Sequence, residues 1–412
     1  MQDAVKAVQH GGKTMSLTLS NRSANVKPSS TLAITAKAKA LRAEGRDIVG
    51  FGAGEPDFAT PSNICDAAIK AINDGFTKYT PASGIADLKK AVCAKFEKFN
   101  HLHYDPDQII ICNGGKHALT NIFDAIVNPG DEVIIPAPYW LSYPEMVKLS
   151  DGKPVFVYST AEQGYKVTAD LIREAVTDKT KALVLNTPNN PTGMVYSRKD
   201  LEEIAALAVE KDFYVVADEM YEALIYTGEE HVSIASLGDE IYKRTITCSG
   251  LSKSYAMTGW RVGYAGAPIE ITKRMSAMQS HATSNVNSIA QKAALEALTG
   301  PTDEMDKMKA EFDRRRQYMY KRLCAMPHLS CLEPEGAFYA FVDASEVCEL
   351  SYKGKKIENA AGLAAILLDE FDTAVIPCQD FGYPKHIRLS YAISMEQIEK
   401  GLDRIENLMK EL

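Results

Sequence analysis

One lysine stands where an amine can do chemistry. Lys253 lies among small and apolar residues, and Arg261 follows it eight positions later. Most lysines are solvated surface residues, and composition alone favours that interpretation. The alternative is a lysine whose pKa is lowered by apolar neighbours, so that its neutral amine can attack a carbonyl group. Whether Lys253 is a surface cation or a nucleophile must therefore be inferred from the residues around it.

A glycine pair indicates a possible anion site. Gly114, Gly115 and Lys116 follow the apolar run 109–112. Two glycines let backbone N–H groups turn toward a ligand, and the N-terminus of a helix favours negative charge. A plain tight turn explains the same residues equally well. The glycines of residues 50–54 do not make a dinucleotide loop, because Glu55 stands where the third glycine belongs.

Other polar or aromatic side chains follow apolar runs or interrupt them. Asp218 comes after the run 215–217, where a helix cap is common and a buried carboxylate is the functional alternative. Arg388 lies within an apolar strand and needs a partner, either in a salt bridge or in a substrate carboxylate. Trp140 taken by itself favours simple packing. By turn chemistry the segment 186–193 is only a loop.

Residues 250–263 favour the functional interpretation of these residues over the structural one. Their sequence, G-L-S-K-S-Y-A-M-T-G-W-R-V-G, resembles the cofactor-lysine signature of the class I and II aminotransferases, which use pyridoxal phosphate (PLP). G-E-P-D-F at 54–58 and N-T-P-N-N-P-T-G at 186–193 resemble two further signatures of that family. The motifs extend from about residue 27 to the C-terminus in the family's order. They are most similar to subgroup Iβ of the bacterial aspartate aminotransferases.

The resemblance implies a role in cofactor binding for each motif. Lys253 would be the catalytic residue that forms the Schiff base, and Asp218 would pair with the pyridine nitrogen so that the ring accepts electrons. Trp140 would stack on the ring, while Asn190 and Tyr221 would hydrogen-bond its phenolic oxygen. The phosphate would be bound by the remaining residues of the set, which are Gly114, Gly115, Lys116, Arg261 and, from a neighbouring subunit, Tyr79.

The resemblance also implies a substrate site. Arg388 would bind the α-carboxylate and Lys116 the distal carboxylate of a dicarboxylic substrate. Gly54 would place its backbone against the substrate, beside Trp140 and Asn190. Thr31 resembles a position that, together with Lys116, marks the members of the family that use prephenate.

One position departs from the family pattern. Gly250 stands where the best-known aspartate aminotransferases carry a phosphate-binding serine. That hydroxyl contact is therefore absent, or it comes from Ser249 or Ser252.

The predicted reaction is a ping-pong transamination, with L-aspartate as the expected donor and 2-oxoglutarate as the acceptor. The freed Lys253 amine would remove the α-proton of the substrate and return it to the cofactor. Two alternatives keep the same fold: prephenate transamination to arogenate, and a PLP-dependent C–S β-lyase. A third is the effector-sensing domain of a transcription regulator. Only about 30 residues precede the matched region, too few for a winged helix.

Apolar runs that alternate with helical stretches predict an α/β fold. Such runs occur at 109–112, 133–135, 182–185, 213–217 and 245–248. This pattern is typical of a mostly parallel sheet covered on both faces, with ligands at the carboxyl ends of the strands. The resemblance implies the PLP-dependent transferase type I fold. We expect an N-terminal segment 1–60 that joins the small domain, a large PLP-binding domain 61–300 and a small C-terminal α+β domain 301–412.

Composition limits the partners. There are 46 Lys and Arg against 54 Asp and Glu, a net charge of −8, which argues against nucleic-acid binding. No apolar run approaches the roughly 18 residues that span a bilayer. The eight cysteines form no C-x-x-C pair and predict no metal site. Without a secretory signal we expect a cytoplasmic location, with amino acids and 2-oxo acids as partners. The family resemblance adds a homodimer with shared active sites.

Overall fold

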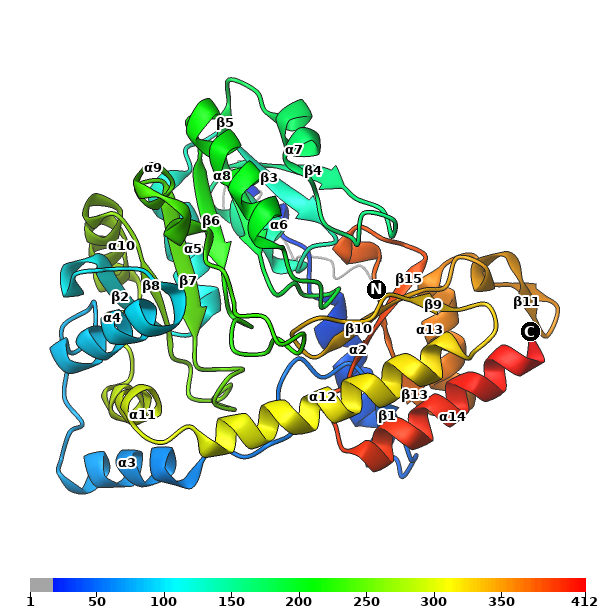
Figure 1. The fold of residues 1–412 in the computed structure, drawn as a ribbon. Helices are drawn as coiled ribbons and strands as arrows, with labels where there is room; N and C mark the ends of the chain where they lie inside the picture. Colours follow the sequence, from blue (N-terminus) through cyan, green and yellow to red (C-terminus); the bar gives the residue numbers. More distant parts are fainter. Residues whose placement is uncertain (1–17) are drawn as a thin grey trace, which may run out of the picture.

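The computed structural model describes residues 18–412, and it contains a large sheet and a smaller one (Figure 1). The large sheet has seven strands in the order β2-β8-β7-β6-β5-β3-β4. Only β8 runs antiparallel to its neighbours, so the prediction of a mostly parallel sheet is confirmed. The strands are β2 (Ile109–Cys112), β3 (Glu132–Ala137), β4 (Lys153–Tyr158), β5 (Thr180–Asn186), β6 (Tyr214–Asp218), β7 (Thr245–Gly250) and β8 (Gly263–Gly266).

Both faces of the large sheet are covered, which explains why its strands are apolar at nearly every position. Successive side chains of a strand point to opposite faces. Val216 of β6 packs in one core with Phe123, whereas Val215 and Ala217 pack in another with Ile204. The first core contains residues of α5 (Gly115–Ile126), α6 (Ser142–Leu149) and α10 (Ile269–Ala282). The second contains residues of α7 (Ala169–Ala175), α8 (Arg198–Lys211) and α9 (Asp239–Tyr242).

Three further helices extend the core at the β2 end of the large sheet. They share apolar side chains with Ile109 and Ile111 of β2. These helices are α3 (Ser62–Asn73), α4 (Ala86–Asn100) and α11 (Ser288–Thr299). In Figure 1 they lie below the sheet and on its left.

The smaller sheet has four strands in the order β14-β15-β10-β9. Its strands are β9 (Ser330–Cys331), β10 (Tyr339–Asp343), β14 (Ile376–Pro377) and β15 (His386–Ser390). The helices that share its core are α12 (Asp303–Cys324), α13 (Ala360–Phe371) and α14 (Met395–Glu411). A short hairpin, β11 (Ser351–Tyr352) with β12 (Lys355–Lys356), lies at the far end.

The N-terminal part of the described chain contacts the C-terminal part. After α1 (Asn21–Ala24) and α2 (Ser30–Ala43), strand β1 (Val49–Gly50) pairs in parallel with β13 (Thr373–Ala374). Val49 and Phe51 are fully buried in the same core as α14. Within residues 18–412 no helix has the length and apolar character needed to cross a bilayer.

Candidate active site

A cavity of about 270 Å³ lies at the carboxyl ends of the strands of the large sheet. Parallel strands end at one edge, so loops that are distant in sequence meet there. Of the predicted site residues, eleven line this cavity: Thr31, Gly54, Gly115, Lys116, Trp140, Asn190, Asp218, Tyr221, Lys253, Arg261 and Arg388. Gly114 lies beside it, against Arg261. Tyr79 does not line the cavity of its own chain and is 92% exposed.

Lys253 follows the end of β7 and points its amine at the opposite loop. Its Nζ donates a hydrogen bond to the carbonyl oxygen of Gly54. Burial lowers the pKa of Lys253 to about 8, and the charge of Glu55 opposes that change only partly. A substantial fraction of the amine is therefore neutral near pH 8, as a nucleophile requires.

Asp218 is the last residue of β6, and only 5% of its surface is exposed. Its carboxylate accepts hydrogen bonds from the Tyr143 hydroxyl at 2.6 Å and from the backbone N–H of Met220 at 3.1 Å. Burial raises the pKa of Asp218 to about 6, and these hydrogen bonds limit the rise. The side chain is thus an anion at neutral pH, held in a place where a cationic partner would stabilise it.

Two hydrogen-bond donors lie near this carboxylate. The hydroxyls of Tyr221 and Tyr339 are 3.0 Å apart and share a hydrogen bond. The side-chain oxygen of Asn190 accepts a hydrogen bond from Arg388 at 2.9 Å, which leaves its NH₂ group available to a ligand. Both Tyr221 and Asn190 are buried at the cavity wall.

The glycine turn is shaped by an arginine. Gly114 has φ +83 and precedes α5, and a Cβ at this position would collide with the guanidinium of Arg261. Arg261 donates to the carbonyl oxygens of Thr258 at 3.0 Å and Asn113 at 3.4 Å, and it has no carboxylate partner in the described chain. The start of α5 and a free guanidinium together make a strong anion site.

The two candidate serines of the lysine segment lie in different places. Ser252 lines the cavity, so its hydroxyl is within the region where an anion would bind. Ser249 is fully buried elsewhere and donates to the carboxylate of Glu222 at 2.6 Å. Of these two, only Ser252 is placed to replace the serine that is missing at Gly250.

Arg388 extends from the smaller sheet into the cavity. It is 3% exposed, and it donates to Asn190 at 2.9 Å and to the Gly52 carbonyl at 3.4 Å. Its guanidinium carbon lies 4.3 Å from the centre of the Tyr339 ring. No acidic residue within the described range pairs with it, and its buried Nε has no hydrogen-bond partner. A structural salt bridge is therefore not the explanation, and the guanidinium fits an incoming carboxylate.

Lys116 is a second cation that lines the cavity. Its Nζ donates to the Ser142 hydroxyl at 3.2 Å and lies 4.8 Å from the centre of the Trp140 ring. Burial, and then the charge of Arg261, lower the pKa of Lys116. Thr31 lies in the first turn of α2, where its buried hydroxyl has no partner among the described residues.

The charge of the cavity favours a ligand with several negative groups. Its charged lining residues are four cations, Lys116, Lys253, Arg261 and Arg388, and one anion, Asp218. PLP has the matching features: an aldehyde for the amine, a ring nitrogen for the carboxylate and a phosphate for the glycine turn. The residues present therefore fit this cofactor, and a cation remains for a substrate carboxylate.

Comparison with known proteins agrees with this geometry. The family pattern described as aminotransferase class I and II matches residues 46–405, which is most of the chain. The chain belongs to this family. The class I and II aminotransferases of this type depend on PLP and act on amino acids and 2-oxo acids. The predictions of family, cofactor and type I fold are thereby confirmed.

Three similar proteins illustrate the match. An aspartate aminotransferase of a Bacillus species (strain YM-2) is 48% identical over 392 residues, which cover 95% of this chain and 99% of the relative. An aspartate/prephenate aminotransferase of Nitrosomonas europaea is 43% identical, covering 95% and 99%. The structure of the Thermus thermophilus aspartate aminotransferase with maleate has a TM-score of 0.90 at 43% identity, covering 95% of this chain and all of that one.

Some residues of this aminotransferase site were not predicted. Tyr143 holds Asp218, Tyr339 meets both Tyr221 and Arg388, and Ser142 bonds Lys116. Ser142 and Tyr143 follow Trp140 closely, so the motif around the tryptophan was the available signal. Tyr339 lies on β10 of the smaller sheet, and its place beside Tyr221 depends on contacts between the two sheets.

Proposed function

We propose that this aminotransferase exchanges an amino group between L-aspartate and 2-oxoglutarate by a ping-pong mechanism. The observation that carries the proposal is that Arg388 and Lys116 lie in one cavity with Lys253 and have no acidic partner within residues 18–412. Two cations suit a substrate with two carboxylates. The names of the relatives and the maleate in the Thermus thermophilus structure support a dicarboxylic substrate for this chain as well.

The proposed roles follow the chemistry of each side chain. When bound, PLP supplies an aldehyde that condenses with amino groups and a ring that accepts electrons from the substrate. Asp218 keeps a proton on the ring nitrogen, with Tyr143 holding the carboxylate in place. Tyr221 and Asn190 donate hydrogen bonds to the phenolic oxygen. The phosphate is held by the glycine turn, Ser252 and Arg261, and by Tyr79 of a second subunit.

Lys253 moves the proton that the reaction transfers. Arg388 binds the α-carboxylate and Lys116 the distal one, which fixes the α-carbon beside the Lys253 amine. With a pKa of about 8 in the unloaded site, this amine is basic enough to take the α-proton and acidic enough to return it.

The first test is a set of amino donors assayed with 2-oxoglutarate. Aspartate should give the highest kcat/KM, and replacement of Lys253 by alanine should abolish both turnover and the visible absorbance of lysine-bound cofactor. Lys273→Ala, on the exposed surface of α10, is the matched control and should leave both unchanged. Retained turnover in Lys253→Ala would refute the assignment.

Two further reactions are tested with the same purified protein. Prephenate transamination is the second candidate function, favoured by the unpartnered hydroxyl of Thr31 in the cavity and by the aspartate/prephenate relative. Arogenate formation from prephenate and an amino donor would establish it. Release of pyruvate from cystathionine without a 2-oxo acid would instead indicate a C–S β-lyase.

We also propose a homodimer with shared active sites, located in the cytoplasm and bound to neither nucleic acid nor membrane. The exposure of Tyr79 supports the shared site, and the absence of disulfides among the eight cysteines supports a reducing compartment. For the domains we propose residues 61–300 as the large one, with residues 1–60 joining 301–412 in the small one. The pairing of β1 with β13 supports this division, and residues 1–17 lie outside the described range.

A further inference from the structure

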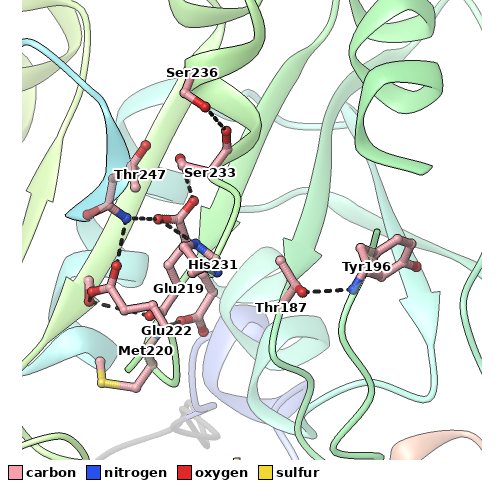
Figure 2. Close-up of polar contacts among 12 residues, drawn as sticks. Thr187, Tyr196, Glu219, Met220, Glu222, His231, Ser233, Ser236 and Thr247 are labelled. Atoms are coloured by element: carbon pink, nitrogen blue, oxygen red, sulfur yellow. Dashed lines mark hydrogen bonds and ion pairs between the residues drawn. The ribbon is translucent and has the colours of Figure 1, made fainter. Parts of the chain in front are cut away.

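Five buried side chains, outside the lining of the cavity, form an ionic network next to the ends of β6 and β7. We call Lys95, Asn100, Glu219, Glu222 and His231 the buried ionic network. The side chains of its four ionisable members are between 1% and 9% exposed. Glu219 follows Asp218 directly, but Asp218 lines the cavity whereas Glu219 does not and bonds to Asn100 and Ser233 instead. Figure 2 shows Glu219, Glu222 and His231 converging, with Ser233 bonded to Glu219.

The two carboxylates of the network accept several hydrogen bonds, whereas neither ring nitrogen of His231 has a hydrogen-bond partner within residues 18–412. The side-chain NH₂ of Asn100 donates to Glu219 at 2.7 Å and to Glu222 at 2.6 Å. Lys95 donates to Glu222, and to the side-chain oxygen of Asn100 at 2.9 Å. His231 Nε2 lies 3.1 Å from Oε2 of Glu219. Each carboxylate is thus surrounded by donors, which lowers the cost of burying it.

The network is attached to both strands that carry the chemistry. The backbone N–H of Glu219 donates to the Cys248 carbonyl at 2.8 Å, which joins the end of β6 to β7. Ser249 on β7 donates to Glu222 at 2.6 Å. Asp218 is the residue before Glu219, and Lys253 is four residues after Ser249. Displacing these carboxylates would therefore displace the ends of β6 and β7 relative to each other.

The charges balance only if His231 is protonated. Glu219 and Glu222 contribute two negative charges, and Lys95 contributes one positive charge. An uncompensated buried charge is strongly destabilising. Burial is the largest single effect and lowers the pKa of His231, but the Glu219 and Glu222 carboxylates together outweigh burial, so the pKa is raised. An imidazolium at this position supplies the missing positive charge.

A metal ion is the other way to supply that charge. Donor atoms of Glu219, Glu222 and His231 lie within 4.8 Å of one another. However, the Lys95 ammonium already contacts the Glu222 carboxylate, and Asn100 and Ser249 donate to the same group. Ammonium, amide and hydroxyl protons thus surround the Glu222 carboxylate, and only the ring nitrogens of His231 lack a hydrogen-bond partner in the described part of the chain. The chain itself provides the counter-charge.

We propose that His231, as an imidazolium, is a positioning residue that completes the charge balance of the buried ionic network and so holds Asp218 and Lys253 at adjacent strand ends. This inference rests on the proposed roles of Asp218 and Lys253. Without the imidazolium, Glu219 places an unbalanced negative charge next to Asp218. Glu219 already adds to the rise in the pKa of Asp218, and the unbalanced charge increases that effect.

The test is a charge-matched set of holoenzymes: wild type, His231→Gln, Glu219→Gln and the double variant. His231→Gln should weaken PLP affinity about tenfold, a typical size for coupled neighbours. It should also move the pH midpoint of the bound cofactor's absorbance upward, because the added negative charge favours protonated forms. Glu219→Gln in the same chain removes that charge and should return both readouts to within about threefold of wild type.

The outcomes show whether His231 acts through its positive charge or only through its packing. A double variant as weak as His231→Gln, or an unchanged His231→Gln protein, would overturn the proposal. So would a divalent ion that raises the melting temperature of wild type while a chelator lowers it, because the site would then bind a cation. If wild type shows no lysine-dependent cofactor absorbance, the proposed function fails instead, and the network is then judged by unfolding alone.

Unfolding has an expected pH dependence of its own. A histidine with a raised folded pKa stabilises fully below its unfolded pKa of about 6.5, and this stability is lost as pH rises through the folded pKa. The ionisable groups that act most strongly on His231 are Glu219, Glu222 and Lys95, and Tyr264 lies against Lys95. The pocket that His231 lines also contains other ionisable side chains, which are Lys98, Glu229, Glu230, Tyr255, Asp306 and Lys309. The melting temperature of wild type relative to the double variant should be highest near pH 6 and fall toward pH 9. A pH-independent difference would contradict a titrating His231.

Discussion

At the scale of single residues, the side chains that would bind the substrate carboxylates and those that would carry out the reaction come from different elements of the cavity wall. Arg388 lies on β15 of the smaller sheet, whereas Lys253 and Asp218 follow strands of the large sheet. Lys116 lies in the first turn of α5 and bonds only a serine and an aromatic face. Each cation should therefore affect a different property of the reaction when it is replaced.

Arg388 and Lys116 give the sharpest contrast. Lys116→Met should lower kcat/KM for aspartate about 10- to 100-fold, the value of one hydrogen-bonded ion pair, while leaving alanine within about threefold. Arg388→Gln should lower kcat/KM for both donors, because every amino acid has an α-carboxylate. Steady-state kinetics with the two donors measure this, and equal losses for both donors in Lys116→Met would show that Lys116 does not bind the distal carboxylate.

Asp218 makes a prediction about pH. Its folded pKa of about 6 lies above the ordinary value, so the folded protein binds this proton more tightly than the unfolded chain. Without cofactor, stability should fall as pH rises from about 4 to about 6 and stay reduced above that. Asp218→Asn removes the loss of folding free energy that ionisation of the buried carboxyl group causes, which is at most about 3 kcal/mol. The variant should therefore raise the cofactor-free melting temperature at pH 8 but not near pH 4.

The same variant should bind PLP more weakly, because a neutral amide cannot pair with a protonated ring nitrogen. Melting curves with and without PLP at the two pH values provide the measurement. A cofactor-free Asp218→Asn protein that is less stable than wild type at pH 8 would show that the ionised carboxylate is already well compensated.

The cavity residues that lie within a short, recognisable sequence motif were predicted from the sequence. Lys253, Asp218 and Asn190 are examples, each at or after a strand end. His231 and Tyr339 were not predicted, because their partners are distant in the chain and no local pattern marks them. Their roles depend on charge balance and on contacts between sheets, which appear only when the chain is folded.

At the scale of elements, the N-terminus of α5 depends on close approach by Arg261. Many elements were predicted within a few residues, including β2 at 109–112 and α2, which ends before Gly45 at φ +93. Strand β10 begins at Tyr339 although the apolar residues start at Ala337, because Ala337 adopts a left-handed φ of 58. Local propensity could not show that turn.

The glycine turn provides a prediction with a matched control. Gly114→Ala introduces a Cβ that collides with Arg261, so affinity for PLP should fall by about 10- to 100-fold. Gly130→Ala also places alanine at a positive φ, +89, but meets no atom within 4 Å. Both variants should lose about 1 to 3 kcal/mol of stability through backbone strain, measured by denaturant unfolding. If both bind PLP equally well, the turn does not hold the phosphate.

At the scale of the whole molecule, the shared active site can be tested by mixing subunits. Tyr79 is among the most exposed apolar side chains of the described chain, yet the family motif places it on a neighbour's phosphate. A Lys253→Ala chain is inactive by itself, and a Tyr79→Ala chain should bind PLP weakly. After unfolding and refolding together, half of the dimers should be mixed, and each should contain one intact site.

The equal mixture should recover about a quarter of wild-type sites, assayed at limiting PLP. Each variant refolded alone is the control. A mixture that shows only the average of the two separate activities would contradict a site shared between subunits.

The fold class followed from apolar runs that alternate with helical stretches, and the structure has that layering. The pairing of β1 with β13, more than 300 residues later, had no signal in the sequence. Contacts between distant segments of this kind need the folded chain to reveal them.

The position of Arg388 has a consequence for how the catalyst is assembled. Its guanidinium reaches from the smaller sheet to Asn190, whose loop follows strand β5 of the large sheet. The hydrogen bond between Tyr221 and Tyr339 also joins the two parts. An amino acid whose carboxylate is bound by Arg388, while its amino group is held on the side of the large sheet, connects the two sheets for as long as it is bound. A bound substrate therefore adds a contact between the two sheets that the protein lacks without it.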